Sequence, residues 1–304
     1  MNKYFFQETN DFHDEIISLH DFVLPAATAL WNFRQTIGDE IKNNSKVTAT
    51  ELAAKYNTAP TTRVSTNLIT PFRDHTWDQQ RERLAEVALV NVIALFEIWC
   101  DELAELFGRK ELAIKLQFPT GPHNTDGVGF ALSELAAVKS PAIANSIYSS
   151  LSRTKKYSLS KLDNLLKCFR YFKELRNCYM HRGRKCDNRL FGWQSQFVVV
   201  ANEASLGMDF IPEHKIYKIG DDVSLSLHGV LGFTEVLLRI ATTVDAELSA
   251  TPVGEKVLVE RISKTASTPL MRERLPNLFT TMGWQGVPLT TELLTVLKAA
   301  AIIR

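Results

Sequence analysis

The sequence predicts a mainly α-helical protein, and three long segments support this fold class. Residues 77–107 and 223–248 are mostly apolar stretches of helical length. Residues 162–184 are amphipathic, because Leu165, Phe169 and other residues at helical spacing fall on one face. At about 1.5 Å per residue, segment 77–107 would be roughly 40 Å long, which is enough to form the backbone of a domain.

Length and composition predict one main domain with appended pieces. The chain has 304 residues, of which 45% are hydrophobic, and this suffices for a substantial core. We place an N-terminal helical extension at 1–76, the main helical domain at 77–250, and a small C-terminal helical module at 251–304.

Charge and cysteine content narrow the functional classes. A formal net charge of +1 argues against a protein that coats nucleic acid indiscriminately and leaves room for a local basic patch. Charged residues interrupt every apolar run of membrane-spanning length, and we see no signal peptide, so we expect a cytoplasmic protein without membrane contact. The four cysteines form no CxxC pair, which favours reduced thiols.

Two helical regions are expected before the main domain. Residues 9–42 have the pattern of one helix or of a helix pair, with a kink or break at Pro25. Residues 48–56 predict a short helix that Thr48 or Thr50 caps.

The segment 77–107 contains a carboxylate that needs a partner. Between Val87 and Trp99 it is apolar nearly all round, so we expect burial on most sides, with only Asn91 and Glu97 as interruptions. Segment 162–184 carries Arg176 in the middle of its apolar sector, where a guanidinium is costly to bury without a counter-charge. We therefore pair Glu97 with Arg176. The alternative is that Glu97 lies on a narrow solvent-exposed strip of this helix and has no buried partner.

The remaining elements follow from shorter patterns. Residues 141–152 predict a helix, and the β-favouring runs within 190–220 predict a small β-hairpin or pair of strands. Residues 272–304 predict two short helices that are broken at residues 283–288.

Polar residues gather at the end of segment 162–184. Asn177 and His181 are spaced i and i+4 on a more polar face, and Gly183 supplies a helix stop. A basic cluster follows, which is either a solvated surface or a guide for a polyanion: Arg182, Arg184, Lys185 and Arg189. Cys178, His181 and Cys186 offer an alternative metal site, but their spacing is unlike that of tight zinc sites, and we expect no metal or cofactor.

Residues 78–250 resemble the HEPN superfamily, whose hallmark is an arginine followed after four to six residues by a histidine. Arg176 and His181 have this spacing, a polar residue follows the arginine, a glycine lies just beyond the histidine, and Glu97 lies on a preceding helix. The resemblance implies an HEPN-like antiparallel helical bundle, here with a small β-hairpin insertion and helical N- and C-terminal extensions.

The same resemblance implies a metal-independent endoribonuclease, often a toxin or an antiviral abortive-infection effector, that acts as a homodimer with a composite active site. His181 would be the general base or acid, Arg176 held by Glu97 would bind the phosphate, and Asn177 would position the substrate or the histidine. We assign RNA binding to Arg182, Arg184, Lys185, Arg189 and Tyr179. An antitoxin or regulatory partner would restrain the activity.

Three other functional hypotheses stay open at this point. The chain can be a catalytically inactive HEPN-like module that binds RNA, a nucleotide or a partner protein through the same cleft. It can be a regulator whose C-terminal segment binds DNA, although that segment has few basic residues. The Arg–Glu pair can also be purely structural, with an incidental exposed histidine. No HExxH, GxSxG or Walker pattern supports another enzyme class.

Overall fold

In the computed structural model, which describes residues 4–56, 67–123, 125–265 and 269–303, helix α3 spans Trp77–Leu106. Its start follows from a capping box, in which the Thr76 hydroxyl accepts from the Gln79 amide and the Gln79 side chain accepts from the Thr76 amide. Its end lies just before Gly108, which has a φ of +65° that glycine adopts without strain. The expected helix is therefore confirmed.

Two further long helices pack against α3 through aromatic side chains. They are α7 (Leu162–His181) and α10 (Leu227–Ser249). The Phe96 ring of α3 lies 4.7 Å from that of Phe169 on α7, and Phe233 of α10 stacks on Phe172 at 4.5 Å. These rings are buried, and they hold the three helices in one core.

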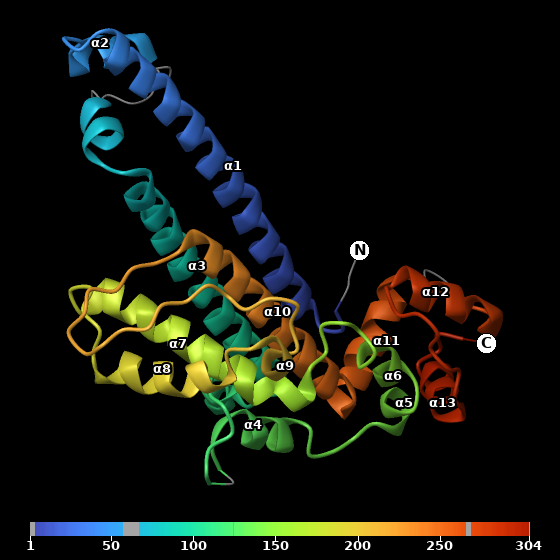
Figure 1. Cartoon of the computed structure of the whole chain (residues 1–304). Coiled ribbons are helices and arrows are strands. Elements are labelled where there is room, and N and C mark those ends of the chain that lie inside the picture. The colour runs from blue at the N-terminus through green and yellow to red at the C-terminus, as the bar shows by residue number, and fades with distance from the viewer. Residues whose placement is uncertain (1–3, 57–66, 124, 266–268, 304) are drawn as a thin grey trace.

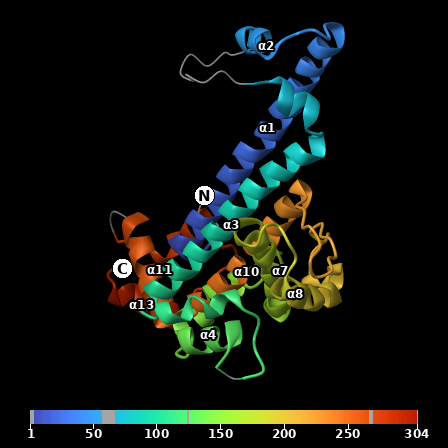
Figure 2. The same cartoon turned by 90° about the vertical axis from the view of Figure 1, so that its left-hand side faces the viewer.

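A long antiparallel arm extends from this core (Figures 1 and 2). It consists of α1 (Gln7–Asn43) and the first part of α3, with α2 (Ala49–Tyr56) and the helical turn η1 (Thr70–Asp74) at its tip. A separate small apolar cluster holds the tip together: Ile37, Leu52, Leu68 and Phe72.

Helix α1 continues through Pro25 as one element, so the segment is a single helix and not a pair. Proline removes the hydrogen bond to the carbonyl of Asp21. Asp21 and Pro25 are both exposed, so this carbonyl lies on the solvent side of the helix, where its missing bond costs little.

The shorter elements complete the body. Before α7 they are η2 (Lys110–Leu112), η3 (Lys115–Gln117), α4 (Gly127–Leu135), α5 (Pro141–Ala144), α6 (Ile147–Leu151) and η4 (Leu159–Lys161). After α7 they are α8 (Asn188–Val200), α9 (Glu203–Leu206), α11 (Pro252–Thr265), η5 (Arg272–Arg274), α12 (Leu275–Thr281) and α13 (Thr291–Ala299). The two short C-terminal helices α12 and α13 are confirmed, whereas the helix expected over 141–152 is two short helices, α5 and α6.

The β-hairpin expected within residues 190–220 is wrong, and the described residues contain no strand. The first run is helix α8, because Asp187 caps it by accepting from the amides of Arg189 and Leu190. The second run lies beside α8 without regular structure. The Gln194 side chain donates to the Tyr217 carbonyl at 2.9 Å and accepts from the Tyr217 amide at 2.8 Å. These two bonds satisfy the backbone groups that a neighbouring strand would otherwise bind.

One apolar cluster contains residues from all three expected parts of the chain. Phe6 near the N-terminus, Phe96 in the middle and Trp284 near the C-terminus all belong to it. The division at 76/77 and 250/251 stays a prediction.

Helix α10 is long and apolar enough to cross a membrane, but 72% of its most apolar window is buried inside the molecule, as in the core helix of a soluble domain.

The N-terminus is fastened to α10 by a buried carboxylate. Asp245 is 1% exposed, and its two oxygens accept from the amides of Phe5 at 2.7 Å and Phe6 at 3.0 Å, where α1 begins. Arg261 of α11 donates to the Tyr4 carbonyl at 3.0 Å and lies over the Trp284 ring. Burial raises the pKa of Asp245 to about 6, from an ordinary value of 3.8.

The raised pKa predicts a pH dependence of stability. The folded chain binds a proton at Asp245 more tightly than the unfolded chain, so this carboxyl favours folding most below pH 4, and the contribution is lost as pH rises through 6. We expect the difference in unfolding free energy between wild type and Asp245→Asn to fall by up to about 3 kcal/mol from pH 4 to pH 7. Urea denaturation at several pH values measures it, and a difference that rises with pH would contradict the assignment.

Candidate ribonuclease site on helix α7

The predicted contact between Glu97 and Arg176 is present. Arg176 Nη2 lies 3.4 Å from Glu97 Oε1 and 3.3 Å from Oε2, so α7 and α3 are joined by this ion pair. The same carboxylate binds a second cation, because Lys173 Nζ is 2.5 Å from Oε1. The side chain of Glu97 is 31% exposed and that of Arg176 is 19% exposed, so the pair is only partly buried.

Arg176 retains a hydrogen-bond donor that the protein does not use. Its Nε is buried and has no partner among the described residues. A guanidinium has five N–H donors, and its planar fork fits two oxygens of a phosphate. Glu97 thus holds Arg176 in place, and a phosphate can reach only the exposed part of this side chain, because Nε is closed to solvent.

His181 lies at the last position of α7 and is exposed to solvent. Beyond it the backbone turns sharply, since Gly183 and Arg184 both have positive φ, of 57° and 61°. The left-handed conformation is unfavourable for an arginine. Two contacts of the Arg184 side chain offset this cost: an ion pair to Glu86 at 2.9 Å and a stacking position 4.7 Å from the centre of the Tyr179 ring.

A buried carboxylate that the sequence analysis did not single out organises this end of α7. Glu174 accepts from Arg170 at 3.0 Å, from Arg182 at 2.9 Å and from the Asn177 amide at 3.3 Å. The side chain of Glu174 is 4% exposed, so these three donors are what makes its burial tolerable. A signal was present in the sequence, because Glu174 precedes Asn177 by three residues, the spacing of neighbours on a helix.

The basic cluster after His181 is largely neutralised within the chain. Arg182 pairs with Glu174 and with Asp187, each at 2.9 Å, Arg184 pairs with Glu86, and Lys185 lies 2.7 Å from Asp222. Arg189 is exposed and has no ion pair within the described part of the chain. The positive field of this cluster is therefore reduced by four carboxylates.

Tyr179 does not lie where an RNA contact requires it. It is 8% exposed, and its hydroxyl donates to the Val223 carbonyl at 3.0 Å and is bonded to Glu82. This residue belongs to the core, as its place in the apolar sector of the helix indicated.

The alternative metal site is not formed among the described residues. The thiols of Cys178 and Cys186 are buried, whereas His181 is exposed. Burial raises the pKa of Cys186 to about 11, which favours the protonated thiol over the thiolate that binds metals.

The burial expected on most sides of α3 between Val87 and Trp99 is present, and one side of the helix is exposed. Val87 is 51% exposed and Ile98 is 52% exposed. With Asn91 and Ala94, which are also exposed, they form a stripe at spacings of four, three and four residues, so they share one face of the helix. The reason is that α1, α7 and α10 cover the other sides of α3 and leave this face open.

Comparison of the chain with protein-family models, curated proteins and solved structures gave no match.

Burial predicts how much each site residue contributes to stability. Glu174→Gln removes a charge that two buried or partly buried arginines require, and we expect a loss of about 3 to 5 kcal/mol in unfolding free energy. Glu97→Gln acts on a partly exposed pair and should cost about 1 to 2 kcal/mol, while exposed His181→Ala should cost less than about 0.5 kcal/mol. Chemical denaturation of the three variants tests this order, and equal losses for the two glutamates would contradict it.

Proposed function

We propose that the protein is a metal-independent endoribonuclease of the HEPN type. The observation that carries the proposal is the ion pair between Arg176 of α7 and Glu97 of α3. Helix α7 ends five residues after Arg176, at the exposed His181. Arg176 offers a partly exposed guanidinium, and His181 offers an imidazole at the surface. RNA cleavage without a metal needs these two functions, a cation for the phosphate and a base for the ribose hydroxyl.

In the proposed reaction, the 2′-oxygen of a ribose attacks the adjacent phosphorus while an imidazole takes its proton. The bond from phosphorus to the 5′-oxygen breaks, and that oxygen leaves with a proton supplied by an imidazolium. The products are a 2′,3′-cyclic phosphate and a 5′-hydroxyl. Arg176 would stabilise the charge on the phosphorane oxygens, and Glu97 would hold its fork in position.

Asn177 and the basic residues have secondary roles in this proposal. The Asn177 amide donates to Glu174, so its carbonyl oxygen is the group left for the substrate or for His181. Arg189 is exposed and would contact the RNA backbone directly. Arg182, Arg184 and Lys185 would contribute only when a phosphate competes with their carboxylate partners.

We further propose a homodimer whose two-fold axis passes near the two His181 side chains. The exposed stripe of Val87, Ala94 and Ile98 on α3 supplies apolar area for a second copy, and Met180, one turn beyond Arg176, is 49% exposed. A self-complementary contact is the commonest route to an oligomer. Covering this stripe would also remove water from the Glu97–Arg176 pair and strengthen its interaction with a phosphate.

The resemblance extends the proposal to biological role. The protein would act in the cytoplasm as a toxin or antiviral abortive-infection effector, and an antitoxin or regulatory partner would restrain it. The ion pairs around the basic cluster favour one alternative, a catalytically inactive module that binds a partner protein, because they lower the attraction for RNA.

The chemistry predicts cleavage that survives EDTA and leaves a 2′,3′-cyclic phosphate, because the nucleophile belongs to the substrate. Purified protein is incubated with total RNA in EDTA, and the product ends are mapped. A substrate with a single 2′-deoxy residue at the cut site should resist. Cleavage that requires magnesium, or that proceeds on the deoxy substrate, would rule out this mechanism.

The composite site predicts complementation between two inactive chains. Arg176→Ala and His181→Ala homodimers should each lose activity, and mixing them should restore one intact site in some heterodimers. Sedimentation measures the oligomeric state in parallel, with Arg189→Gln as an exposed control that should leave dimerisation unchanged. A monomer that cleaves RNA at micromolar concentration would show that the site is complete within one chain.

A further inference from the structure

Lys173 shares the carboxylate that holds Arg176. It lies three residues before Arg176 on α7, a spacing that puts both side chains on the same side of a helix. Lys173 Nζ is 2.5 Å from Glu97 Oε1, whereas the shortest distance from Arg176 to this carboxylate is 3.3 Å, between Nη2 and Oε2. Because the attraction between opposite charges rises as they approach, Glu97 interacts more strongly with Lys173 than with Arg176.

The fold fixes the ammonium group of Lys173 from a second side. Its Nζ donates to Gln117 Oε1 of η3 at 2.8 Å, and Gln117 is 4% exposed. Nζ also lies 5.7 Å from the centre of the Phe169 ring. The Lys173 side chain is 14% exposed, unlike most lysines, which extend into solvent. Its position next to Glu97 is therefore set by three elements, α3, α7 and η3.

The three charges leave a positive excess. Lys173 and Arg176 carry two positive charges and Glu97 carries one negative charge, which gives a net charge of +1. Among the described residues, neither cation forms an ion pair with a second carboxylate. Asp101, one turn after Glu97 on α3, is exposed to solvent. Without Lys173, Glu97 and Arg176 would form a neutral pair.

We propose that Lys173 is a positioning residue of the candidate ribonuclease site, which neutralises Glu97 so that Arg176 keeps its charge for a phosphate. This role rests on the proposed function and adds to it a residue that acts without touching the substrate. Lys173 is the more enclosed of the two cations, and Arg176 lies nearer to His181 along α7. In a neutral pair, a phosphate at Arg176 would have to compete with the full charge of Glu97.

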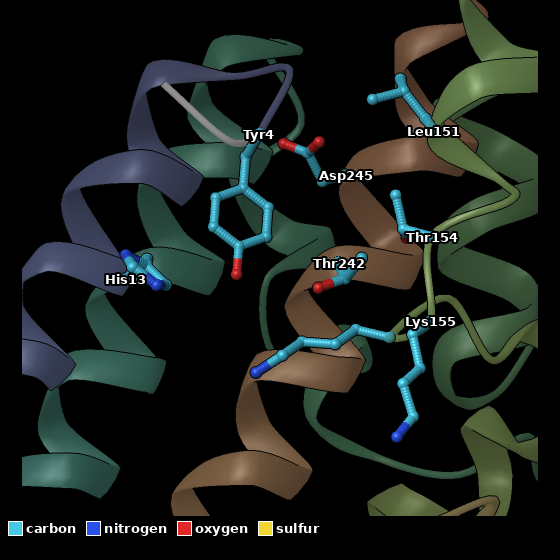
Figure 3. A pocket seen from close by; sticks show the side chains of 8 residues that line it. Tyr4, His13, Leu151, Thr154, Lys155, Thr242 and Asp245 are labelled. Carbon is cyan, nitrogen blue, oxygen red and sulfur yellow. The ribbon is translucent and has the colours of Figure 1, made fainter. Parts of the chain in front are cut away.

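A second group with the same arrangement of charges lies elsewhere and supplies a matched control. Glu235 of α10 binds Lys156 Nζ at 2.5 Å and Arg239 Nε at 3.2 Å. Lys156 lines a cavity of about 250 Å³ beside Tyr4, which Figure 3 shows. This group shares no residue with the candidate ribonuclease site. Removing the charge of Lys156 therefore makes the same chemical change without changing the charge at Arg176.

Binding of a strand that cannot be cleaved tests this role. The probe is a fluorescent single strand of about 12 residues and mixed sequence with 2′-deoxy sugars throughout, and fluorescence anisotropy measures its affinity for the whole protein. Lys173→Met keeps the apolar stem and removes the charge, and we expect about tenfold weaker binding. Because Lys173 is largely enclosed, this loss should be the same at about 0.1 M and about 0.5 M salt. The loss caused by Arg189→Gln, at an exposed residue, should shrink as salt increases.

A double variant separates an indirect role from a direct contact. Lys173→Met combined with Glu97→Gln leaves the positive charge of Arg176 without a carboxylate and should recover most of the lost affinity, whereas the loss of a direct contact between Lys173 and the phosphate would not be recovered. Cleavage should not recover, because Arg176 has then lost the carboxylate that orients it, so KM returns toward the wild-type value while kcat stays low. Lys173→Arg should bind within about threefold of wild type, and the control Lys156→Met within about twofold.

Thermal melting establishes that each variant is folded, and Lys173→Gln replaces Lys173→Met if the latter is unstable. The role of Lys173 is overturned if its neutral variant binds like wild type, if the loss disappears at high salt, or if the double variant does not recover. Wild type that binds the strand but cleaves no RNA would contradict only the ribonuclease proposal, because binding alone decides the role of Lys173. Wild type that does not bind the strand would contradict both.

Discussion

The contact of aromatic rings among α3, α7 and α10 fixes the geometry on which the candidate site depends. Phe96, Phe169 and Phe233 each come from a different helix and are fully buried. Because close-packed rings tolerate little displacement, they set the rotation of α7 against α3. Glu97 lies one residue after Phe96, and Arg176 lies seven residues after Phe169, so this packing brings the two charges together.

Charge pairing around α7 shows how the chain buries a polar helix end. Glu97 forms ion pairs with Lys173 and Arg176, while Glu174 forms ion pairs with Arg170 and Arg182. Each carboxylate thus offsets more than one cation, and Arg182 in turn pairs with both Glu174 and Asp187. The sharing of carboxylates among several cations makes the burial of these charges tolerable.

Local patterns located most helices because their signals are short in range. The capping box at Thr76, the glycine after α3 and the apolar periodicity of 162–184 each act within a few residues. The same patterns failed for α8, where β-favouring residues lie on a helix. There Asp187 caps the first turn, and Leu190, Gln194 and Phe197 form one buried face, so the environment overrides intrinsic preference.

The sequence by itself determined the helical class, the bounds of the long helices and the pairing of Glu97 with Arg176, because periodicity and an unpaired charge in an apolar sector are properties of the chain alone. Only the tertiary structure decided which cations are free. Arg184 and Lys185 are neutralised by Glu86 and Asp222, which lie far away in the sequence. It also decided that one face of α3 is open and that α1 is fastened through Asp245, since both depend on which helices become neighbours.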